Sequence, residues 1–221
     1  MISRIEKIIE EHTASVRACM IVPPEGCCPR CSEEGAAFKR HDSRKRSFRF
    51  IVGYDVHVNK SLLVRWKCPI CGDTFTDYPS FAMPHKRYVL TDMERLSAEY
   101  VEDERQTYRK AVCPQGIPIG YQEPDGRPVE RFLAHSTPWR WISSLGSMKD
   151  TLSEALHLIR QKDSTSTIFR EVFPVAPHKY QSSQRKLILE NARRLLRASL
   201  EFYRLFGHKI FPHLETVCSW K

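Results

Sequence analysis

The chain reads Cys28-Pro29-Arg30-Cys31 and, 36 residues later, Cys68-Pro69-Ile70-Cys71. Each stretch is a Cys-Pro-x-Cys knuckle, a tight turn in which two thiolates three positions apart point at one ion. Zinc takes four ligands tetrahedrally, with Zn–S distances of about 2.3 Å. We therefore expect one structural Zn²⁺ bound by both knuckles, through Cys28, Cys31, Cys68 and Cys71.

The other cysteines leave one alternative open. Cys27 could replace Cys28 through a Cys27/Cys31 pairing. We favour Cys28 because its knuckle then has the same form as the second one. Cys19, Cys113 and Cys218 have no partner at ligand spacing, and we expect free thiols there. A catalytic redox pair would need a Cys-x-x-Cys in a βαβ context, and the sequence shows none.

Composition restricts the class of protein. The 221 residues suffice for one large or two small domains. The charged N-terminal segment has no apolar leader region, and no apolar run approaches the roughly 20 residues that span a membrane. We therefore predict a protein of the reducing cytoplasm, associated with the nucleoid.

Positive charge is concentrated in two segments. Of the net charge of +9, residues 38–67 carry +7, because nine Lys/Arg face two Asp. Residues 182–221 carry +5, from eight Lys/Arg and three Glu. Concentrated basic patches are what a polyanionic partner requires, so nucleic acid is the expected partner class.

The first part of the chain is predicted to be a helix followed by a β-hairpin. Residues 2–19 place apolar side chains on one helical side, and residues 46–67 alternate with period two. We expect a bulge or bend at Gly53 and the hairpin turn at residues 59–61. One face of this hairpin should carry Arg65 and Lys67, with Arg49 and His57 beside them. Residues 75–88 are expected to cross the hairpin as an ordered extended segment.

Residues 89–148 outline a helix-turn-helix. Thr91 is expected to cap a first helix with Glu94 in a capping box, and residues 105–112 suggest a second. Residues 113–134 are expected to be irregular. Ser136 or Thr137 should cap a third helix that ends at Gly146. The recognition helix of this motif presents its N-terminal side chains to base edges.

The remainder is predicted to be helical, over residues 149–162, 165–173 and 183–206. The last helix should carry an apolar stripe (Ile188, Ala192, Leu195, Ser199, Phe202 and Phe206) beside a basic one (Lys186, Arg193, Arg197 and Arg204). We expect His208 and His213 to be loop residues rather than ligands.

The predicted fold class is therefore α+β. Residues 1–24 form an N-terminal helix, and 25–88 form a zinc ribbon of antiparallel β-hairpins. Residues 89–148 form a helix-turn-helix-like domain with a loop insertion, and 149–221 form a helical C-terminal region.

Residues 25–148 resemble a known family. The two knuckles, the basic hairpin ending in Arg65-Trp66-Lys67, Phe75 and Tyr78-Pro79-Ser80-Phe81 are similar to the N-terminal zinc ribbon of bacterial insertion-sequence transposases. Residues 84–88 and 135–141 resemble stand-alone zinc-ribbon/helix-turn-helix relatives of those enzymes. The resemblance implies sequence-specific DNA binding. Such transposases carry a ribonuclease-H-like domain with three metal-binding carboxylates, whereas only 73 residues follow position 148 here.

We therefore expect a non-catalytic double-stranded-DNA-binding protein, namely a transposition accessory or targeting factor or a mobile-element regulator. A transposase or another catalytic subunit is the expected protein partner. The expected nucleic-acid contacts are Lys39, Arg40, Arg44, Lys45, Arg46, Arg49, Arg65, Lys67, Lys86, Arg87, Ser136, Thr137, Arg140, Lys186, Arg193, Arg197 and Arg204.

Three alternatives remain. The chain could be an adaptor that recruits a catalytic partner, or it could bind RNA. A nuclease or transferase would have to use an unrecognised site, for which Asp92, Glu94, Asp103 and Glu104 are the candidate carboxylates.

Overall fold

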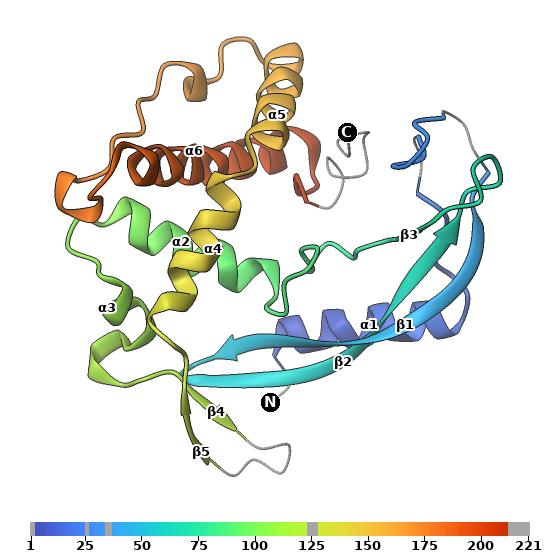
Figure 1. Cartoon of the computed structure of the whole chain (residues 1–221), viewed down its shortest axis with the longest axis horizontal. Helices are drawn as coiled ribbons and strands as arrows, with labels where there is room; N and C mark the ends of the chain where they lie inside the picture. The colour runs from blue at the N-terminus through green and yellow to red at the C-terminus, as the bar shows by residue number, and fades with distance from the viewer. Residues whose placement is uncertain (1–2, 25–26, 34–36, 123–127, 212–221) are drawn as a thin grey trace. The chain divides into compact units, whose positions relative to one another are not determined.

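The computed structural model describes residues 3–24, 27–33, 37–122 and 128–211. It is a mixed α+β structure with an N-terminal helix, a β-hairpin sheet that carries four clustered cysteines, and a mostly helical C-terminal region (Figure 1). The chain forms two compact units. The N-terminal unit comprises residues 1–52, 57–90 and 211–221, and the helical unit comprises residues 53–56 and 91–210.

Helix α1 (Arg4–Arg17) begins at a capping box. The Ser3 hydroxyl accepts from the Glu6 N–H at 3.2 Å, and the Glu6 carboxylate accepts from the Ser3 N–H at 3.4 Å. These bonds satisfy two backbone donors that a helix start leaves unpaired. Ile9 and Val16 are fully buried on one side of the helix. The predicted helix over residues 2–19 is thus confirmed within the described residues, with shorter ends.

The hairpin turn lies at Gly53–Tyr54, where Gly53 has φ +60°. Strand β1 (Lys39–Val52) pairs with β2 (Asp55–Lys67), and β3 (Thr74–Thr76) pairs antiparallel with the end of β2. The turn predicted at residues 59–61 is wrong, because these residues lie inside β2. Ser61 is buried there, with its hydroxyl 2.8 Å from that of Thr13. Tertiary contact with α1 therefore overrides the local turn preference.

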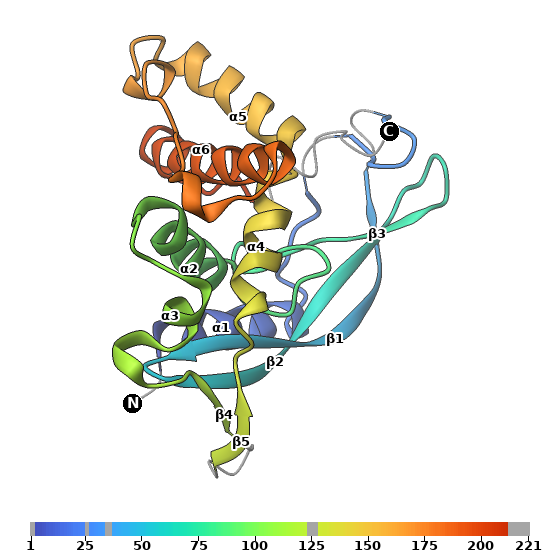
Figure 2. The same ribbon diagram turned by 60° about the vertical axis from the view of Figure 1, so that its left-hand side comes forward.

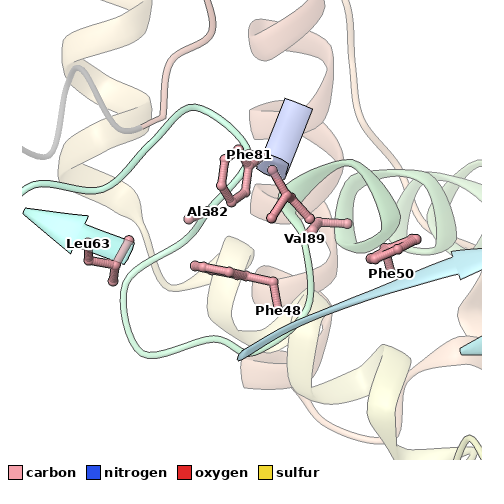
Figure 3. Close-up of a cluster of buried hydrophobic side chains, with 7 residues drawn as sticks. Phe48, Phe50, Leu63, Phe81, Ala82 and Val89 are labelled. Atoms are coloured by element: carbon pink, nitrogen blue, oxygen red, sulfur yellow. The ribbon is translucent and has the colours of Figure 1, made fainter. Parts of the chain in front are cut away.

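One face of the hairpin is packed into a core. Phe48, Phe50, Phe81, Ala82 and Val89 lie together there (Figure 3). Leu63 and Ile9 complete the cluster.

The prediction that Arg49 and His57 lie on the same face of the hairpin is wrong. His57 stacks on Phe50, with ring centroids 5.5 Å apart, so it lies on the packed face. Strand alternation sends Arg49 to the opposite side of β1 from Phe48 and Phe50. There its guanidinium lies 5.8 Å from the centre of the Tyr88 ring.

The segment after β3 returns to the outer edge of β1. The Arg49 N–H donates to the Arg87 carbonyl at 2.8 Å, and the Val89 N–H donates to the Arg49 carbonyl at 2.9 Å. The chain then enters α2 (Leu90–Glu102) directly. Thr91 therefore lies inside the first turn of this helix, and its predicted capping role is wrong.

The segment between the second and third predicted helices contains a small β-structure. Helix α3 (Tyr108–Val112) is followed by a short 3₁₀ turn, β4 (Gly120–Gln122) and β5 (Pro128–Phe132). Strand β4 pairs parallel with Asp55 and Val56 and antiparallel with β5. The prediction of an irregular 113–134 segment is thus wrong for both strands. Strand β4 pairs with residues 55 and 56, far away in the sequence, and β5 pairs with β4 itself.

Helices α4 (Ser136–Gly146), α5 (Lys149–Lys162) and α6 (Ser183–Phe206) complete the helical unit (Figure 2). The position before α4 is His135, without a side-chain cap, so Ser136 and Thr137 are first-turn residues and not caps. The helix predicted over residues 165–173 is only a 3₁₀ turn, Thr167–Phe169. Before it, the Asp163 carboxylate accepts from the N–H and hydroxyl of Thr165, a local bonding pattern that competes with a helix.

Helix α6 confirms its predicted bounds and apolar stripe. Ser182 caps its start, and Gly207 ends it with φ +74°, the left-handed conformation that glycine adopts most readily. Ala192, Leu195 and Phe202 of the stripe are buried.

Gly146 sets the distance between α4 and α6. A Cβ atom on Gly146 would lie 2.1 Å from the Ile188 carbonyl oxygen, far inside van der Waals contact. The predicted helix end at Gly146 is correct, but the glycine is required there for close backbone packing. The neighbouring Asn191 amide also donates to the Gly146 carbonyl at 3.4 Å.

Gly146→Ala should lower the thermal midpoint of the helical signal, because α4 and α6 must separate. The expected loss of stability is about 3 kcal/mol, the upper part of the range for overpacked sites. Circular dichroism at 222 nm during heating measures it.

Gly207→Ala is the matched control. Its added Cβ meets nothing within 4 Å, so only the left-handed backbone is penalised, by about 1 kcal/mol. Equal melting of the two variants would contradict the packing role of Gly146.

Candidate metal centre and basic hairpin

The four knuckle cysteines form one cluster. Their sulfur atoms all lie within 4.8 Å of one another. The Sγ atoms of Cys28 and Cys71 are 3.8 Å apart, and those of Cys31 and Cys68 are 3.9 Å apart. A regular tetrahedron with Zn–S distances of about 2.3 Å has edges of about 3.8 Å. The cluster thus fits a single structural metal ion, with zinc the best match to four thiolates.

The two knuckles have the same backbone geometry. The N–H of Cys28 donates to the Glu33 carbonyl at 3.0 Å, and the N–H of Cys68 donates to the Asp73 carbonyl at 2.9 Å. One residue after each second cysteine, the chain is left-handed, with φ +59° at Ser32 and +77° at Gly72. The glycine signals this turn in the sequence, whereas the serine does not.

Backbone N–H groups favour the thiolate form of Cys68, the first cysteine of the second knuckle. The N–H of Cys71, assisted by that of Ile70, donates to the Cys68 sulfur. These bonds lower the pKa of Cys68 to about 7, against the opposing effect of burial. Because zinc binds the thiolate and not the thiol, this arrangement prepares the ligand.

The cluster uses Cys28 and does not include Cys27. Cys28 and Cys68 are fully buried, whereas Cys31 and Cys71 are exposed. Cys19 and Cys113 lie outside the cluster as free thiols, and Cys218 falls outside the described residues.

A second hydrophobic cluster surrounds the inner ligands. Val16 of α1, Phe38, and Val64 and Trp66 of β2 pack with Cys28 and Cys68. The metal site therefore joins the open end of the hairpin to α1.

Two lysines lie beside the second knuckle. Lys39, the first residue of β1, and Lys67, the last of β2, line a hollow together with Pro69 and Ile70. Four thiolates and one Zn²⁺ have a formal charge of −2. We interpret the two lysines as the cations that balance this charge, so they are weaker candidates for phosphate contacts than their positions in the sequence suggest.

Several predicted contact residues have internal partners in the structure. Arg40 donates to the Val16 carbonyl at 2.9 Å, at the end of α1. Arg65 pairs with Asp42 at 3.2 Å and also donates to the Thr74 hydroxyl.

Arg46 is held in the same way. It donates to the Lys86 carbonyl at 2.6 Å and to the Tyr78 hydroxyl at 3.2 Å. Its guanidinium lies over the rings of Phe48 and Tyr78, at 5.6 and 5.4 Å from their centres. Arg46 thus fastens the 78–86 segment to β1.

The middle of the hairpin carries cations that face solvent. Arg44 and Lys45 are exposed and have no ion-pair partner among the described residues. Because His57 lies on the packed face, Val58 and Lys60 point to the other side. Lys60 is exposed, and Val58 is 53% exposed. We define the outer hairpin face as Lys45, Ser47, Arg49, Val58 and Lys60.

Sequence reasoning missed Lys60 because it placed the residue in a turn. Its assignment to the outer face follows from the corrected turn at Gly53. Of the remaining predicted contacts in this unit, Arg87 is exposed and Lys86 is half-buried.

The basic stripe of α6 exists, but its members have intramolecular partners. Lys186 pairs with Glu190 at 3.7 Å, and Arg197 pairs with Glu171 at 3.4 Å. Arg193 donates to the Pro174 carbonyl.

Arg204 is the most strongly engaged of these cations. It pairs with Glu201 at 2.8 Å and Asp163 at 3.3 Å. The bonds from Arg204, with one from Ser166, lower the pKa of Glu201 to about 2. The charges of Lys186, Arg197 and Arg204 are therefore balanced by carboxylates within the helical unit.

Helix α4 faces mostly inward. Trp141, Ile142 and Leu145 are buried. Of its predicted contact residues, Ser136 and Thr137 are half-buried and Arg140 is exposed.

The candidate carboxylates do not gather. Within residues 3–24, 27–33, 37–122 and 128–211, the four cysteines are the one group of three or more potential metal ligands. Glu94 instead pairs with Lys209 at 2.7 Å, and Asp92 lies 3.8 Å from Arg95. His208 packs edge-on against Phe202 in the loop after α6, and His213 lies outside the described residues.

Among the described residues, no helix has both the length and the apolar character that crossing a bilayer requires.

One family profile matches the chain. It is a domain of unknown function (DUF6431), and it matches residues 28–112, from the first ligand through the second knuckle to α3. The comparison with curated proteins and the comparison with solved structures gave no significant match. The resemblance to transposases thus remains a hypothesis.

The purified, reduced chain should contain one zinc ion per molecule. Cys28→Ser and Cys68→Ser should each lose the zinc. Both should also lower the midpoint at which the N-terminal unit unfolds, because these ligands share a hydrophobic core with Trp66. Elemental analysis and tryptophan fluorescence measure these outcomes.

Cys27→Ser and Cys113→Ser are the controls, and both should retain one zinc. If Cys27→Ser loses the metal while Cys28→Ser keeps it, the ligand assignment is wrong.

Proposed function

We propose that the chain is a zinc-stabilised, non-catalytic DNA-binding protein that grips duplex phosphates with the outer hairpin face and the adjoining Arg44. The observation that carries the proposal is the cluster of exposed cations without ion-pair partners in the described residues, Arg44, Lys45 and Lys60, on a hairpin fixed at both ends. An exposed cation with no partner inside the protein breaks no ion pair when it binds a phosphate.

The dimensions of the hairpin suit a duplex. Alternate residues on a strand lie about 6.8 Å apart, so Lys45 and Arg49 are separated by about 14 Å. A two-stranded β-ribbon can enter the major groove of B-DNA, which is about 12 Å wide. Val58, exposed between the cations, offers an apolar contact of the kind that thymine methyl groups accept.

Aromatic burial favours duplex over single-stranded nucleic acid. Single-strand binders present aromatic side chains on which bases stack. In the described part of the N-terminal unit, every Phe, Tyr and Trp side chain is buried or half-buried: Phe38, Phe48, Phe50, Trp66, Phe75, Tyr78, Phe81, Tyr88 and Phe211. The deep, narrow major groove of A-form RNA also excludes a ribbon, so we favour DNA.

Sequence preference is assigned to the start of α4. Arg140 is exposed there, and Ser136 and Thr137 lie within the same first turns. This assignment rests on the helix-turn-helix outline and is separate from the phosphate grip.

The biological role follows from the family resemblance. A DNA-binding chain of this outline without a catalytic domain would act as a transposition accessory or targeting factor, or as a regulator of a mobile element. A transposase would be the catalytic partner.

Arg44→Gln/Lys45→Gln should weaken duplex binding and reduce its salt dependence. Two lost phosphate contacts should make the slope of log K against log salt shallower by about 1.8. Fluorescence anisotropy with a labelled duplex, between about 50 and 200 mM salt, measures this slope.

Arg197→Gln is the matched control, because Arg197 already pairs with Glu171 and should contribute little. Wild-type binding that does not change over this salt range would refute the phosphate grip.

Arg140→Ala should relax sequence preference while leaving the salt slope nearly unchanged, since a base contact carries about 1–3 kcal/mol of discrimination. Selection from random duplexes measures the preference. Lys45→Ala should do the opposite and weaken binding to all sequences alike. If the Arg140 variant selects the same motif as the wild type, the proposal that α4 contacts the bases is wrong.

A further inference from the structure

Each knuckle presents one cysteine to solvent and keeps the other inside. Cys31 and Cys71, the second cysteines of the two turns, are exposed, whereas Cys28 and Cys68 are fully buried. The sulfur of each exposed cysteine lies close to the buried sulfur of the other knuckle. The Sγ atoms of Cys31 and Cys68 are 3.9 Å apart, and those of Cys71 and Cys28 are 3.8 Å apart. A small oxidant in solution can therefore reach one cysteine of each such pair.

These pairs have the arrangement of a redox-sensitive site. Cysteines that oxidise readily are thiolates, are accessible to solvent and stand beside a second cysteine that can complete a disulfide. Binding of a metal ion requires the thiolate form of its ligands, which meets the first condition. The exposure of Cys31 and Cys71 meets the second, and the buried sulfur next to each of them meets the third.

We propose that the metal centre is a peroxide-sensitive switch that forms two disulfides across the knuckles, Cys31–Cys68 and Cys28–Cys71. Hydrogen peroxide oxidises each exposed thiolate to a sulfenic acid, with release of hydroxide. The buried thiolate of the pair then attacks the sulfenic sulfur, which forms the S–S bond and releases a second hydroxide. Four thiolates thus lose four electrons to two molecules of peroxide. The chain is left without thiolates for the metal ion and releases it.

The pairing across the knuckles keeps the hairpin closed. A disulfide within one knuckle would leave the two knuckles unconnected once the metal ion is lost. The two proposed disulfides instead join the segment before β1 to the segment after β2, as the metal ion does. The oxidised chain therefore retains the closed end of the hairpin and with it the outer hairpin face.

Oxidation also changes the charge beside two lysines. The zinc-bound cluster has a formal charge of −2, whereas two disulfides have none. Glu33 and Asp73, the carboxylates that follow the knuckles, keep their charges. Lys39 and Lys67 line the hollow beside the second knuckle, are exposed and have no ion-pair partner among the described residues. Without the anionic cluster they become available to phosphates. This step rests on the phosphate grip proposed above, by which the oxidised chain binds a duplex more tightly.

The redox step is tested on the zinc-loaded wild type and on a variant in which Cys19, Cys27, Cys113 and Cys218 are replaced by serine, so that the four ligands are its only cysteines. Peroxide should release the zinc to a colorimetric chelator, with about two molecules of peroxide consumed per zinc. Proteolysis without reductant, followed by mass spectrometry with fragmentation, should identify the two disulfides across the knuckles. Dithiothreitol with added zinc should restore the metal content. The wild type gives the same readouts independently of the variant.

The effect on binding is tested with the reduced and the oxidised chain and a labelled duplex, by fluorescence anisotropy. Two added phosphate contacts steepen the salt slope by about 1.8, so between about 50 and 200 mM salt the oxidised chain should lose about 12-fold more affinity than the reduced chain. Lys39→Gln/Lys67→Gln should release zinc like the wild type but show equal slopes before and after oxidation. Arg44→Gln/Lys45→Gln is the control, which should bind more weakly in both states and still gain affinity on oxidation.

Three results would overturn the switch. They are retention of zinc under peroxide, disulfides within single knuckles, and loss of the folded N-terminal unit on oxidation, measured by tryptophan fluorescence. Release of zinc with an unchanged salt slope would overturn the role of Lys39 and Lys67. If neither form binds a duplex, the proposed function fails, whereas zinc release and the disulfide map still decide whether the switch exists.

Discussion

The organisation of the N-terminal unit depends on closing the open end of one long hairpin. A two-stranded hairpin is marginally stable in water by itself. Here the Gly53 turn fixes one end, and the four sulfurs, which lie within 4.8 Å of one another, fix the other. With both ends fixed and α1 packed on one face, the middle of β1 needs no core of its own. Residues 41–45 are consequently exposed on both faces.

Exposed cations on β1 also protect an open sheet edge. The strand lies at the end of the sheet order, and its outer edge is bonded to the chain at Arg49, by residues 87 and 89. The remaining edge would invite a foreign strand if its side chains were apolar. The charged side chains of Arg44 and Lys45 discourage such pairing. The composition that suits a phosphate backbone thus also keeps the molecule from aggregating through its edge.

Features set by residues close together in the sequence could be predicted, whereas features set by contacts between distant segments could not. The metal ligands and α6 follow from local spacing, periodicity and capping. The turn was misplaced because Asn59-Lys60-Ser61 has turn propensity, whereas the deciding contact, from Ser61 to Thr13, spans 48 residues. The basic segments could be located from the sequence, but the ion pairs within them could not. Arg204, for example, pairs with Asp163, which lies 41 positions away.

The separation of the knuckles also has a consequence for biosynthesis. Cys31 and Cys68 are 37 positions apart, so at about 5–20 residues per second the first half-site waits about 2–7 s on the ribosome for the second. The segment made in that interval includes most of the chain's net positive charge. Mutual repulsion keeps such a segment extended and solvated. The nascent strand can therefore wait for its metal without collapsing onto itself.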